Sequence, residues 1–176
     1  IEDFPPSELN VEQGEELFNI PFKNGNTYAS CFENGGIGIR SNYPYFDEEK
    51  EQVVTLEQDI NECRKKNGEK PLSYYKGGPM ADISAYMAYT SRGNIINVEI
   101  PNNDKAIDAY EMGRKLYFTK VGQLNFSCAD CHVYQTGSKL RADIPSPGIG
   151  HPTHFPAYRS SAGRLVTLHE RFAGCL

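Results

Sequence analysis

The stretch "FSCADCH", residues 126–132, carries the pattern C-x-x-C-H at Cys128, Cys131 and His132. This pattern is typical of covalent attachment of c-type haem. The two cysteines bond to the haem vinyl groups, and the adjacent histidine is placed to ligate the iron from one face. The sequence therefore predicts one covalently attached haem c on this segment.

Two other kinds of site use the same residue types. A structural zinc site needs a second pair of Cys or His ligands, and the other cysteines stand singly at Cys31, Cys63 and Cys175. A thioredoxin-like redox pair needs a βαβ setting, which the sequence does not show. The histidine directly after the second cysteine favours haem over both.

A helix is expected shortly before this segment, in "NDKAIDAYEMGRKLYFTK", residues 103–120, because its apolar residues recur at helical spacing. Gly113 and Tyr117 lie one turn apart, and we expect the glycine to let another helix cross closely beside the aromatic ring. A helix of this kind before C-x-x-C-H resembles the N-terminal helix of class I cytochromes c. An ordinary core helix fits the same pattern.

The first half of the chain repeats this arrangement. "VEQGEELF" (residues 11–18) matches "YEMGRKLY" (residues 110–117) in its glycine, its leucine and its last aromatic residue. "YASCFENGG" (residues 28–36) then follows, as "NFSCADCH" (residues 125–132) follows in the second half. Such a repeat indicates two copies of one small structural unit.

The two copies differ at the haem pattern. Asn34 and Gly35 stand where the second copy has its second cysteine and its histidine. We therefore predict a mainly α protein with two cytochrome c-like domains in tandem, residues 1–98 and 99–176, of which the first binds no haem.

The remainder of the first copy is expected to be helical at residues 53–68 and 78–93, where apolar residues share one helical face. Met80 and Met87 resemble haem ligands, but we expect them in the core because this copy lacks the haem pattern. Residues 94–104 are expected to link the two copies.

The pairing of the other cysteines follows from haem attachment. With Cys128 and Cys131 bonded to haem, Cys31 and Cys63 remain in the first copy, and we predict a disulfide between them; two unpaired buried thiols are the alternative. Export, which c-type haem attachment implies in bacteria, favours oxidation. Cys175 is left over, and an odd cysteine in an exported protein suggests a reactive thiol or an intermolecular link.

Arg171 lies four residues before Cys175 in "LHERFAGCL", residues 168–176. In a helix or a tight turn the guanidinium approaches the sulfur, and a nearby cation lowers the pKa of a thiol. A thiolate can serve as a nucleophile or as a soft iron ligand. Spacing alone does not choose between Cys175 and the rival sixth ligands, which are His151, His154, His169 and Met112.

Composition disfavours two classes of partner. The 176 residues carry a net charge of −5, which disfavours binding to nucleic-acid phosphates. No apolar run approaches membrane-spanning length. The chain begins at Ile1 without a signal peptide, as in a cytosolic protein or the mature form of an exported one; haem attachment favours the second, in the bacterial periplasm.

Four stretches make the chain resemble the SoxA family, the catalytic cytochrome subunit of the SoxAX complex of bacterial sulfur oxidation. They are "VVTLEQDINECRKKNGEKPLSYY" (residues 53–75), "GQLNFSCADCH" (residues 122–132), "FPAYR" (residues 155–159) and "GRLVTLHERFAGC" (residues 163–175). The likeness runs nearly end to end, and the last two stretches are specific to the family, whereas C-x-x-C-H alone is not.

The resemblance implies how the site residues are used. It implies the single-haem branch of the family, in which Cys31 and Cys63 pair. His132 and Cys175 would be the axial ligands of the active-site haem iron, with Cys175 often a persulfide, and Arg171 would line the site and hold anionic thiosulfate. Members usually continue with a further helical segment after the active-site cysteine.

The resemblance also implies an activity, that of an L-cysteine S-thiosulfotransferase. Such an enzyme joins thiosulfate oxidatively to a cysteine of the carrier protein SoxYZ, and the electrons leave through haem to SoxX, a small cytochrome c. Two other functions stay open: a pure electron-transfer cytochrome, and a carrier-independent thiosulfate dehydrogenase that forms tetrathionate. The stretch "GRLVTLHERFAGC" favours conjugation.

Overall fold

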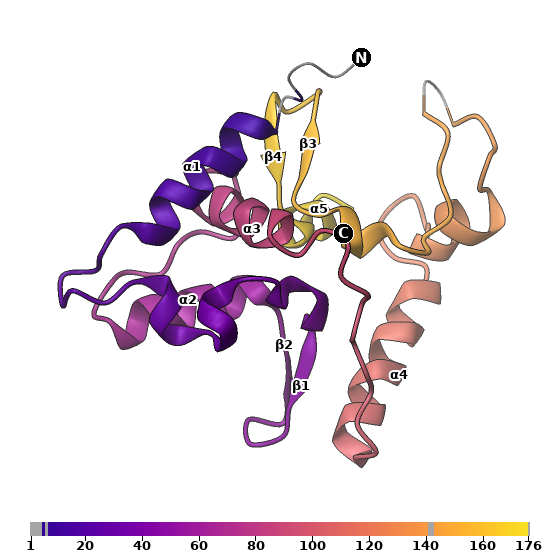
Figure 1. Cartoon of the computed structure of the whole chain (residues 1–176). Coiled ribbons are helices and arrows are strands. Elements are labelled where there is room, and N and C mark those ends of the chain that lie inside the picture. Colours follow the sequence, from indigo (N-terminus) through magenta and orange to yellow (C-terminus); the bar gives the residue numbers. More distant parts are fainter. Residues whose placement is uncertain (1–4, 6, 141–142, 176) are drawn as a thin grey trace. The chain divides into compact units, whose positions relative to one another are not determined.

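The computed structural model in Figure 1 describes residues 5, 7–140 and 143–175. Expectations that rest on Ile1 or Leu176 lie outside these residues. The chain divides into two compact units. The first unit contains Ile1–Tyr45, Val53–Glu99 and Phe155–Cys175, and the second contains Phe46–Gln52 and Ile100–His154.

The first unit is mainly helical. Its helices are α1 (Glu8–Asn19), α2 (Leu56–Lys66), α3 (Pro79–Tyr89) and α5 (Leu168–Ala173). Short 3-10 turns are η1 (Tyr28–Cys31), η2 (Glu33–Gly36) and η3 (Ile39–Asn42). Strand β3 (Ala157–Arg159) pairs antiparallel with β4 (Arg164–Val166). Helices α2 and α3 confirm the predicted helices in this half.

The second unit contains α4 (Asp104–Phe118), the π-helical turn η4 (Asp130–Tyr134) and the 3-10 turn η5 (His151–His154). Strands β1 (Tyr45–Asp47) and β2 (Gln52–Val54) form a two-stranded sheet. Of this hairpin, Phe46–Gln52 belong to the second unit, and Tyr45, Val53 and Val54 belong to the first. The mainly α class is confirmed, whereas the tandem domains and their boundary at residue 98 stay predictions. Among the described residues, no helix combines the length and apolar character needed to cross a membrane.

Polar side chains set where two of these helices begin. Thr55 caps α2, because its Oγ1 accepts a hydrogen bond from the Gln58 N–H at 3.3 Å while the Gln58 side chain accepts one from the Thr55 N–H at 2.7 Å. Asn103 caps α4, since its Oδ1 accepts hydrogen bonds from the N–H groups of Lys105 and Ala106 at 2.9 and 3.4 Å. Both arrangements satisfy backbone donors that a helix start leaves free. The predicted helix over residues 103–120 is thereby confirmed.

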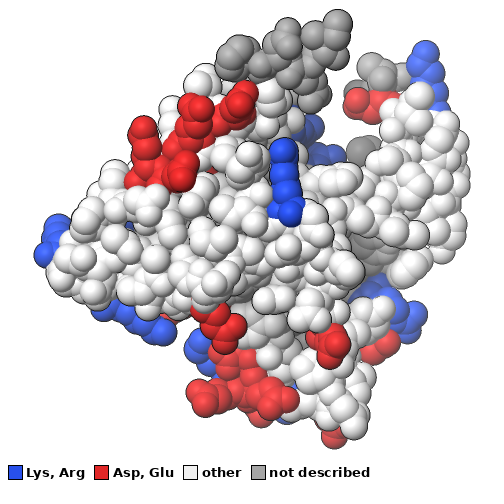
Figure 2. All heavy atoms as spheres, in the orientation of Figure 1, with Lys and Arg blue, Asp and Glu red and all other residues white. Residues whose placement is uncertain are grey.

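Helix α1 has one solvated face and one packed face. The acidic side chains that gather over it in Figure 2 belong to the exposed residues Glu8, Glu12, Glu15 and Glu16. On the packed face, a Cβ at Gly14 would clash with the carbonyl oxygen of Asp82 in α3. The Asn10 side chain also donates to the Asp82 carboxylate at 2.8 Å. The missing side chain of Gly14 is therefore what lets α1 cross α3 closely.

The close crossing that the sequence predicts at Gly113 is not made within the unit that contains α4. Among the described residues of that unit, no atom lies within 4 Å of the position that a Cβ on Gly113 would take. The next α-helix along the chain, α5, belongs to the first unit, so a crossing by that helix stays a prediction. The equivalent glycine of the first copy, Gly14, has the close crossing instead.

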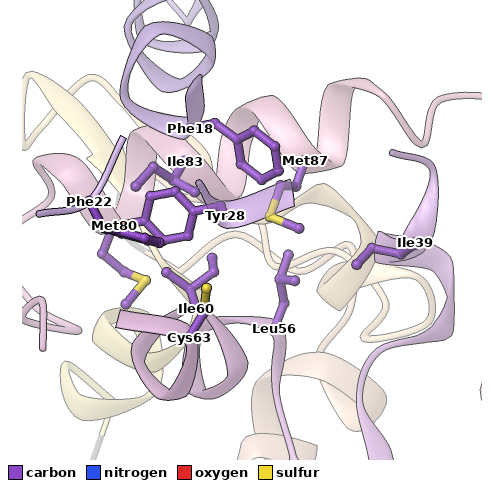
Figure 3. Close-up of a cluster of buried hydrophobic side chains, with 10 residues drawn as sticks. All are labelled: Phe18, Phe22, Tyr28, Ile39, Leu56, Ile60, Cys63, Met80, Ile83 and Met87. Carbon is purple, nitrogen blue, oxygen red and sulfur yellow. The ribbon is translucent and has the colours of Figure 1, made fainter. Parts of the chain in front are cut away.

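The core of the first unit is made of side chains from α1, α2, α3 and the turns between them (Figure 3). Tyr28 stacks on Phe18 with 5.6 Å between ring centroids, and Phe22 meets Tyr28 edge-on at 4.8 Å. Met80 and Met87 are buried in the same cluster, which confirms their predicted place in the core. The ten buried members are Phe18, Phe22, Tyr28, Ile39, Leu56, Ile60, Cys63, Met80, Ile83 and Met87.

The stretch that replaces C-x-x-C-H in the first copy follows a left-handed backbone. Asn34, Gly35 and Gly36 have φ angles of 48°, 62° and 83°. A Cβ on Gly36 would lie 2.6 Å from Cζ of Phe18 and 3.5 Å from Cε of Met87. The backbone of this turn therefore lies directly against the core, so that side chains fill the space beside it.

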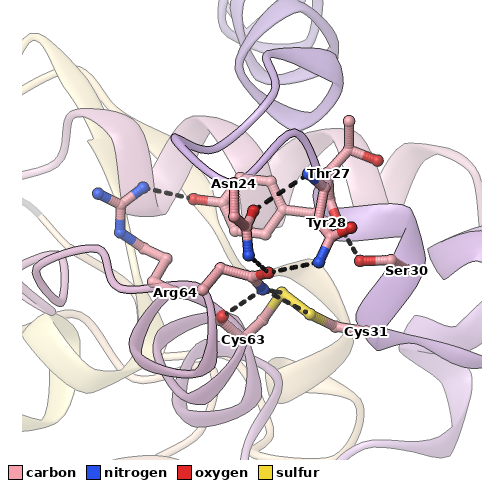
Figure 4. The surroundings of a disulfide bond; sticks show 9 residues. Asn24, Thr27, Tyr28, Ser30, Cys31, Cys63 and Arg64 are labelled. Atoms are coloured by element: carbon pink, nitrogen blue, oxygen red, sulfur yellow. Dashed lines mark hydrogen bonds between the residues drawn. A yellow bond between two sulfur atoms is a disulfide. The ribbon is translucent and has the colours of Figure 1, made fainter.

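Cys31 and Cys63 form a disulfide that joins η1 to α2, which confirms the predicted pairing (Figure 4). The side-chain amide of Asn67 donates to the Cys63 carbonyl at 2.8 Å and lies 3.5 and 3.7 Å from the two sulfurs. The side-chain oxygen of Asn67, Oδ1, accepts hydrogen bonds from the side-chain amides of Asn24 and Asn26 at 2.7 and 2.9 Å. The disulfide and the hydrogen bonds of Asn67 therefore both stabilise the C-terminal end of α2.

Segment 155–175 is held in the first unit by its own contacts. Thr167, which is buried, donates to the Tyr74 carbonyl at 2.7 Å and accepts from the Glu170 N–H at 3.2 Å. The Glu170 carboxylate accepts hydrogen bonds from the Arg164 guanidinium and from the Lys76 N–H. The guanidinium of Arg164 lowers the pKa of Glu170 below its ordinary value.

We expect loss of the disulfide to destabilise the protein strongly. The bridge has a sequence separation of 32 residues, for which loop entropy gives about 3–4 kcal/mol. In a chain of this size that corresponds to a fall in Tm of about 10 °C. Thermal unfolding of the Cys31→Ala/Cys63→Ala protein checks this, with Cys175→Ala as the matched control that keeps the bridge. Equal Tm values for the double variant and the parent would contradict it.

We expect the stabilising effect of Glu170 to depend on pH. Because its pKa is lower in the folded than in the unfolded chain, the ionised carboxylate stabilises the fold above its ordinary pKa, about 4.3, and loses this effect as pH falls through the folded-state value. Glu170→Gln should therefore lower Tm at neutral pH, and the difference from the parent should vanish in acid. Exposed Glu12→Gln is the control. A Tm difference that is the same at every pH would rule this out.

Candidate haem and thiol site

The C-x-x-C-H segment starts at a reciprocal cap. The Asp130 carboxylate accepts hydrogen bonds from the N–H and the hydroxyl of Ser127 at 2.8 and 2.9 Å, and the Ser127 oxygen accepts from the Asp130 N–H at 3.1 Å. The bond from the Ser127 N–H is the main reason why the pKa of Asp130 is lowered. The cap starts the helical turn that carries Cys128 and Cys131. Neither cysteine belongs to the disulfide.

His132 is oriented by a backbone carbonyl. Its Nδ1 lies 2.9 Å from the Ser146 oxygen, and a carbonyl can only accept, so Nδ1 carries the proton and Nε2 is the basic nitrogen. A metal-bound histidine commonly donates its other ring N–H to such a partner. The His132 carbonyl also accepts from the Gly148 N–H at 3.0 Å. The imidazole therefore has the tautomer that ligation through Nε2 requires.

A second histidine lies beside this ring. The rings of His132 and His151 meet edge-on with 4.6 Å between centroids. The Nε2 of His151 lies 2.7 Å from the Ser146 hydroxyl oxygen. His151 thus supports the same loop that holds His132.

Helix α4 packs against this loop through Tyr117 and Gly148. A Cβ on Gly148 would clash with the Tyr117 hydroxyl and lie 3.5 Å from Cβ of His132. Burial raises the pKa of Tyr117. The aromatic residue that the sequence singled out therefore lies close to the attachment segment, although a loop, and not a crossing helix, covers it within this unit.

The residues next to the attachment segment fit a haem. Phe126, Val133 and Tyr134 are neighbours of C-x-x-C-H in sequence and are all about half exposed or more, and Ile149 in the loop after it is 95% exposed. Covering apolar surface with an apolar group is favourable by about 25 cal/mol per Å². Two helical-turn cysteines, a correctly protonated histidine and this exposed apolar surface together suit a covalently attached porphyrin.

Arg171 and Cys175 lie at the C-terminal end of the described chain. Arg171 is in the last turn of α5, and Cys175, which is exposed, donates its N–H to the Phe172 carbonyl at 2.9 Å. In the described part of the chain, no hydrogen bond joins the Arg171 guanidinium to the Cys175 sulfur. Cys175 belongs to the first unit and His132 to the second, so their pairing on one iron stays a prediction.

The rival sixth ligands have different surroundings. The Nε2 of His169 lies 2.9 Å from Oγ1 of Thr55, so that this nitrogen is engaged within the first unit. Met112 is exposed on α4, and His154 ends the turn η5. Among the described residues, no three His, Cys, Asp or Glu side chains form a group able to hold a metal ion.

Sequence reasoning missed several residues that support the site. The cap formed by Ser127 and Asp130 was readable, because S-x-x-D before a helical turn is a known start signal. The carbonyl of Ser146 had no such signal, since any residue can offer a carbonyl. Gly148 and Asn67 likewise act through contacts with distant segments that spacing along the chain does not reveal.

Comparison with known proteins identifies the family of the chain. A protein-family profile described as "SoxA/TsdA, cytochrome c domain" matches residues 13–96. The L-cysteine S-thiosulfotransferase subunit SoxA of Chlorobaculum tepidum is 54% identical over 175 residues, which covers 99% of this chain and 60% of the relative. The protein of the same name from Allochromatium vinosum is 52% identical, covering 99% of this chain and 62% of its own length.

A solved structure matches as well. The crystal structure of SoxXA from P. pantotrophus has a TM-score of 0.85 at 32% sequence identity, over 97% of this chain and 64% of that chain. The chain thus spans about 60% of the length of the curated relatives it matches. More than half of the residues are identical in these two relatives over nearly the whole chain, and the matched range includes the C-x-x-C-H segment. This chain therefore belongs to the SoxA family.

Proposed function

We propose that this protein conjugates thiosulfate to a cysteine of a carrier protein, as an L-cysteine S-thiosulfotransferase. One observation carries the proposal: the match to subunits with that name extends over 99% of this chain and so takes in both the C-x-x-C-H segment and the α5 segment. The substrate is thiosulfate, the carrier is of the SoxYZ type, and a small cytochrome c of the SoxX type forms the heterodimer and accepts the electrons.

The proposed cofactor is one haem c, bonded to Cys128 and Cys131 and ligated by Nε2 of His132. The hydrogen bond from His132 Nδ1 to the Ser146 carbonyl supports this assignment. The haem supplies an acceptor for electrons when it is bound. On the family resemblance, Cys175 would be the second protein ligand of the haem iron.

The first copy is proposed to be a cytochrome c-like domain without haem, over residues 1–98, followed by the haem domain over residues 99–176. Two observations support this. The span of the family profile, residues 13–96, falls inside the first of these ranges. In addition, Gly36, which directly follows Asn34 and Gly35, lies against Phe18 and Met87 of a core already filled by side chains.

The chemistry assigned to this chain rests on Cys175 and Arg171. The sulfane sulfur of thiosulfate bonds to the Cys175 sulfur as two electrons leave, which gives Cys–S–S–SO₃⁻. The carrier thiolate then attacks the sulfane sulfur and releases the Cys175 thiolate, a step that depends on thiolate fraction and access. Overall, one thiolate and one thiosulfate give one S-sulfonated persulfide and two electrons.

Arg171 is proposed to bind the anionic sulfonate and to favour the thiolate form of Cys175. A guanidinium binds planar or tetrahedral oxyanions with two parallel hydrogen bonds. The periplasm is the proposed compartment, because c-type haem attachment and the Cys31–Cys63 disulfide both fit an oxidising, exported setting.

We expect Cys175→Ser to abolish formation of the carrier adduct, because the sulfur that accepts thiosulfate is lost. We expect Arg171→Gln to raise KM for thiosulfate about 10- to 100-fold, since a hydrogen bond to a charged group contributes about 1.5–3 kcal/mol. The measurement is the mass of the carrier after incubation with thiosulfate, the haem-loaded enzyme and the partner cytochrome. Arg92→Gln, at an arginine that lies over Tyr89, is the matched control.

Full conjugating activity in Cys175→Ser would contradict the mechanism. Consumption of thiosulfate with no carrier present would instead assign a tetrathionate-forming thiosulfate dehydrogenase. Reversible haem reduction without any thiosulfate-dependent turnover would leave an electron-transfer cytochrome.

A further inference from the structure

We infer that His169 is a positioning residue that docks α5 on the N-terminus of α2 and thereby sets where Arg171 and Cys175 lie. The inference rests on the proposed function for the roles of those two residues. All the contacts that carry it lie within the first unit.

The first contact is with the cap of α2. Nε2 of His169 lies 2.9 Å from Oγ1 of Thr55. The same hydroxyl oxygen accepts the N–H of Gln58 at 3.3 Å. A threonine hydroxyl has one proton and two lone pairs, so after capping α2 it can still donate to or accept from the imidazole. One hydroxyl therefore joins the start of α2 to α5.

The second contact is with a buried acid. Oε2 of Glu57 lies 3.7 Å from the same Nε2, and the Glu57 side chain is only 8% exposed. A buried carboxylate needs a polar partner, and the Nε2 of His169 lies beside this one, where it donates a proton if Thr55 accepts. Glu57 lies in the first turn of α2, where the helix dipole also favours negative charge.

The third contact is a stacked ring. The imidazole of His169 lies on the ring of Tyr74, with 4.9 Å between centroids and 24° between planes. The carbonyl of Tyr74 accepts the hydroxyl of Thr167, the residue that caps α5. Tyr74 thus holds both the start of α5 and its first-turn histidine.

The geometry of α5 relates the docking of His169 to the positions of Arg171 and Cys175. Successive helix residues are about 100° apart around the axis, so Arg171, two positions after His169, lies on the opposite side of α5 from the docked face. The N–H of Gly174 donates to the Glu170 carbonyl at 3.1 Å and that of Cys175 to the Phe172 carbonyl at 2.9 Å. The thiol-bearing residue therefore extends the last turn of α5, and its position follows the orientation of the helix. A role for His169 Nε2 as an iron ligand would require these contacts to break.

Two substitutions of His169 distinguish the effect of its ring stacking from the effect of its polar contacts. His169→Phe keeps an aromatic ring for stacking on Tyr74 but removes both polar contacts, whereas His169→Gln keeps a group able to hydrogen-bond Thr55. Asn10→Ala is the matched control, because it removes a side-chain hydrogen bond between α1 and α3 of the same unit without touching α5.

The experiment uses the haem-loaded complex with its partner cytochrome. Hydrogen exchange of the amides in residues 168–175 and the alkylation rate of reduced Cys175 by iodoacetamide both report on α5 without any need for thiosulfate activity. We expect His169→Phe to change both rates about tenfold relative to the parent, with no change in α2 or α3 amides, and to lower kcat/KM for thiosulfate about tenfold. His169→Gln should recover part of each effect, and Asn10→Ala should leave α5 unchanged.

Unchanged exchange and alkylation in His169→Phe would overturn the docking role. Faster exchange spread equally over α2, α3 and α5 would also overturn it, because it would indicate a general loss of stability. Altered α5 exchange with an unchanged kcat/KM in an active enzyme would overturn the positioning role. If the parent itself forms no carrier adduct, the proposed function fails, while exchange and alkylation still decide whether His169 sets the position of Cys175.

Discussion

The docking of α5 on the first unit is the constraint on which the site depends. The thiol of Cys175 has a defined position only if tertiary contacts hold the segment that carries it. Here the buried Thr167, the carboxylate of Glu170 and the imidazole of His169 hold that segment against α2 and the chain at residues 74–76. The first unit therefore provides the platform for Cys175, while the second unit holds the C-x-x-C-H segment.

On the proposal that the first copy binds no haem, its own contacts would stabilise it in place of the cofactor. Its glycine–aromatic helix is retained, with Gly14 against α3 and the ring of Phe18 in the core. The cysteine that would have bonded to haem bonds instead to α2, and Asn67 hydrogen-bonds beside the bridge. A disulfide lowers the conformational entropy of the unfolded chain, as a covalently attached cofactor does. Because α2 is fastened at one end by the disulfide and receives α5 at the other, the bridge and the thiol site are linked through one helix.

Local signals in the sequence predicted much of this structure, whereas tertiary partners could not be read from it. The helix over residues 103–120, the buried methionines and the Cys31–Cys63 pair followed from periodicity and from the count of cysteines. No helix of the same unit crosses at Gly113, because a glycine permits a close approach but does not specify which helix makes it. The partner of His132 is a backbone carbonyl, which every residue offers. The hydrogen bond between Thr55 and His169 joins residues 114 positions apart, and no spacing rule predicts such a contact.

Peptide mapping by mass spectrometry of the haem-matured protein, without prior reduction, tests the central claim most directly. The account predicts one haem on the peptide that contains Cys128, Cys131 and His132, a disulfide-linked pair of peptides from Cys31 and Cys63, and a Cys175 peptide that gains mass on exposure to thiosulfate and an oxidant and loses it on reduction. Absence of haem from the C-x-x-C-H peptide would contradict the assignment of one haem to the second copy, and haem on Cys31 would contradict the assignment of the disulfide to the first.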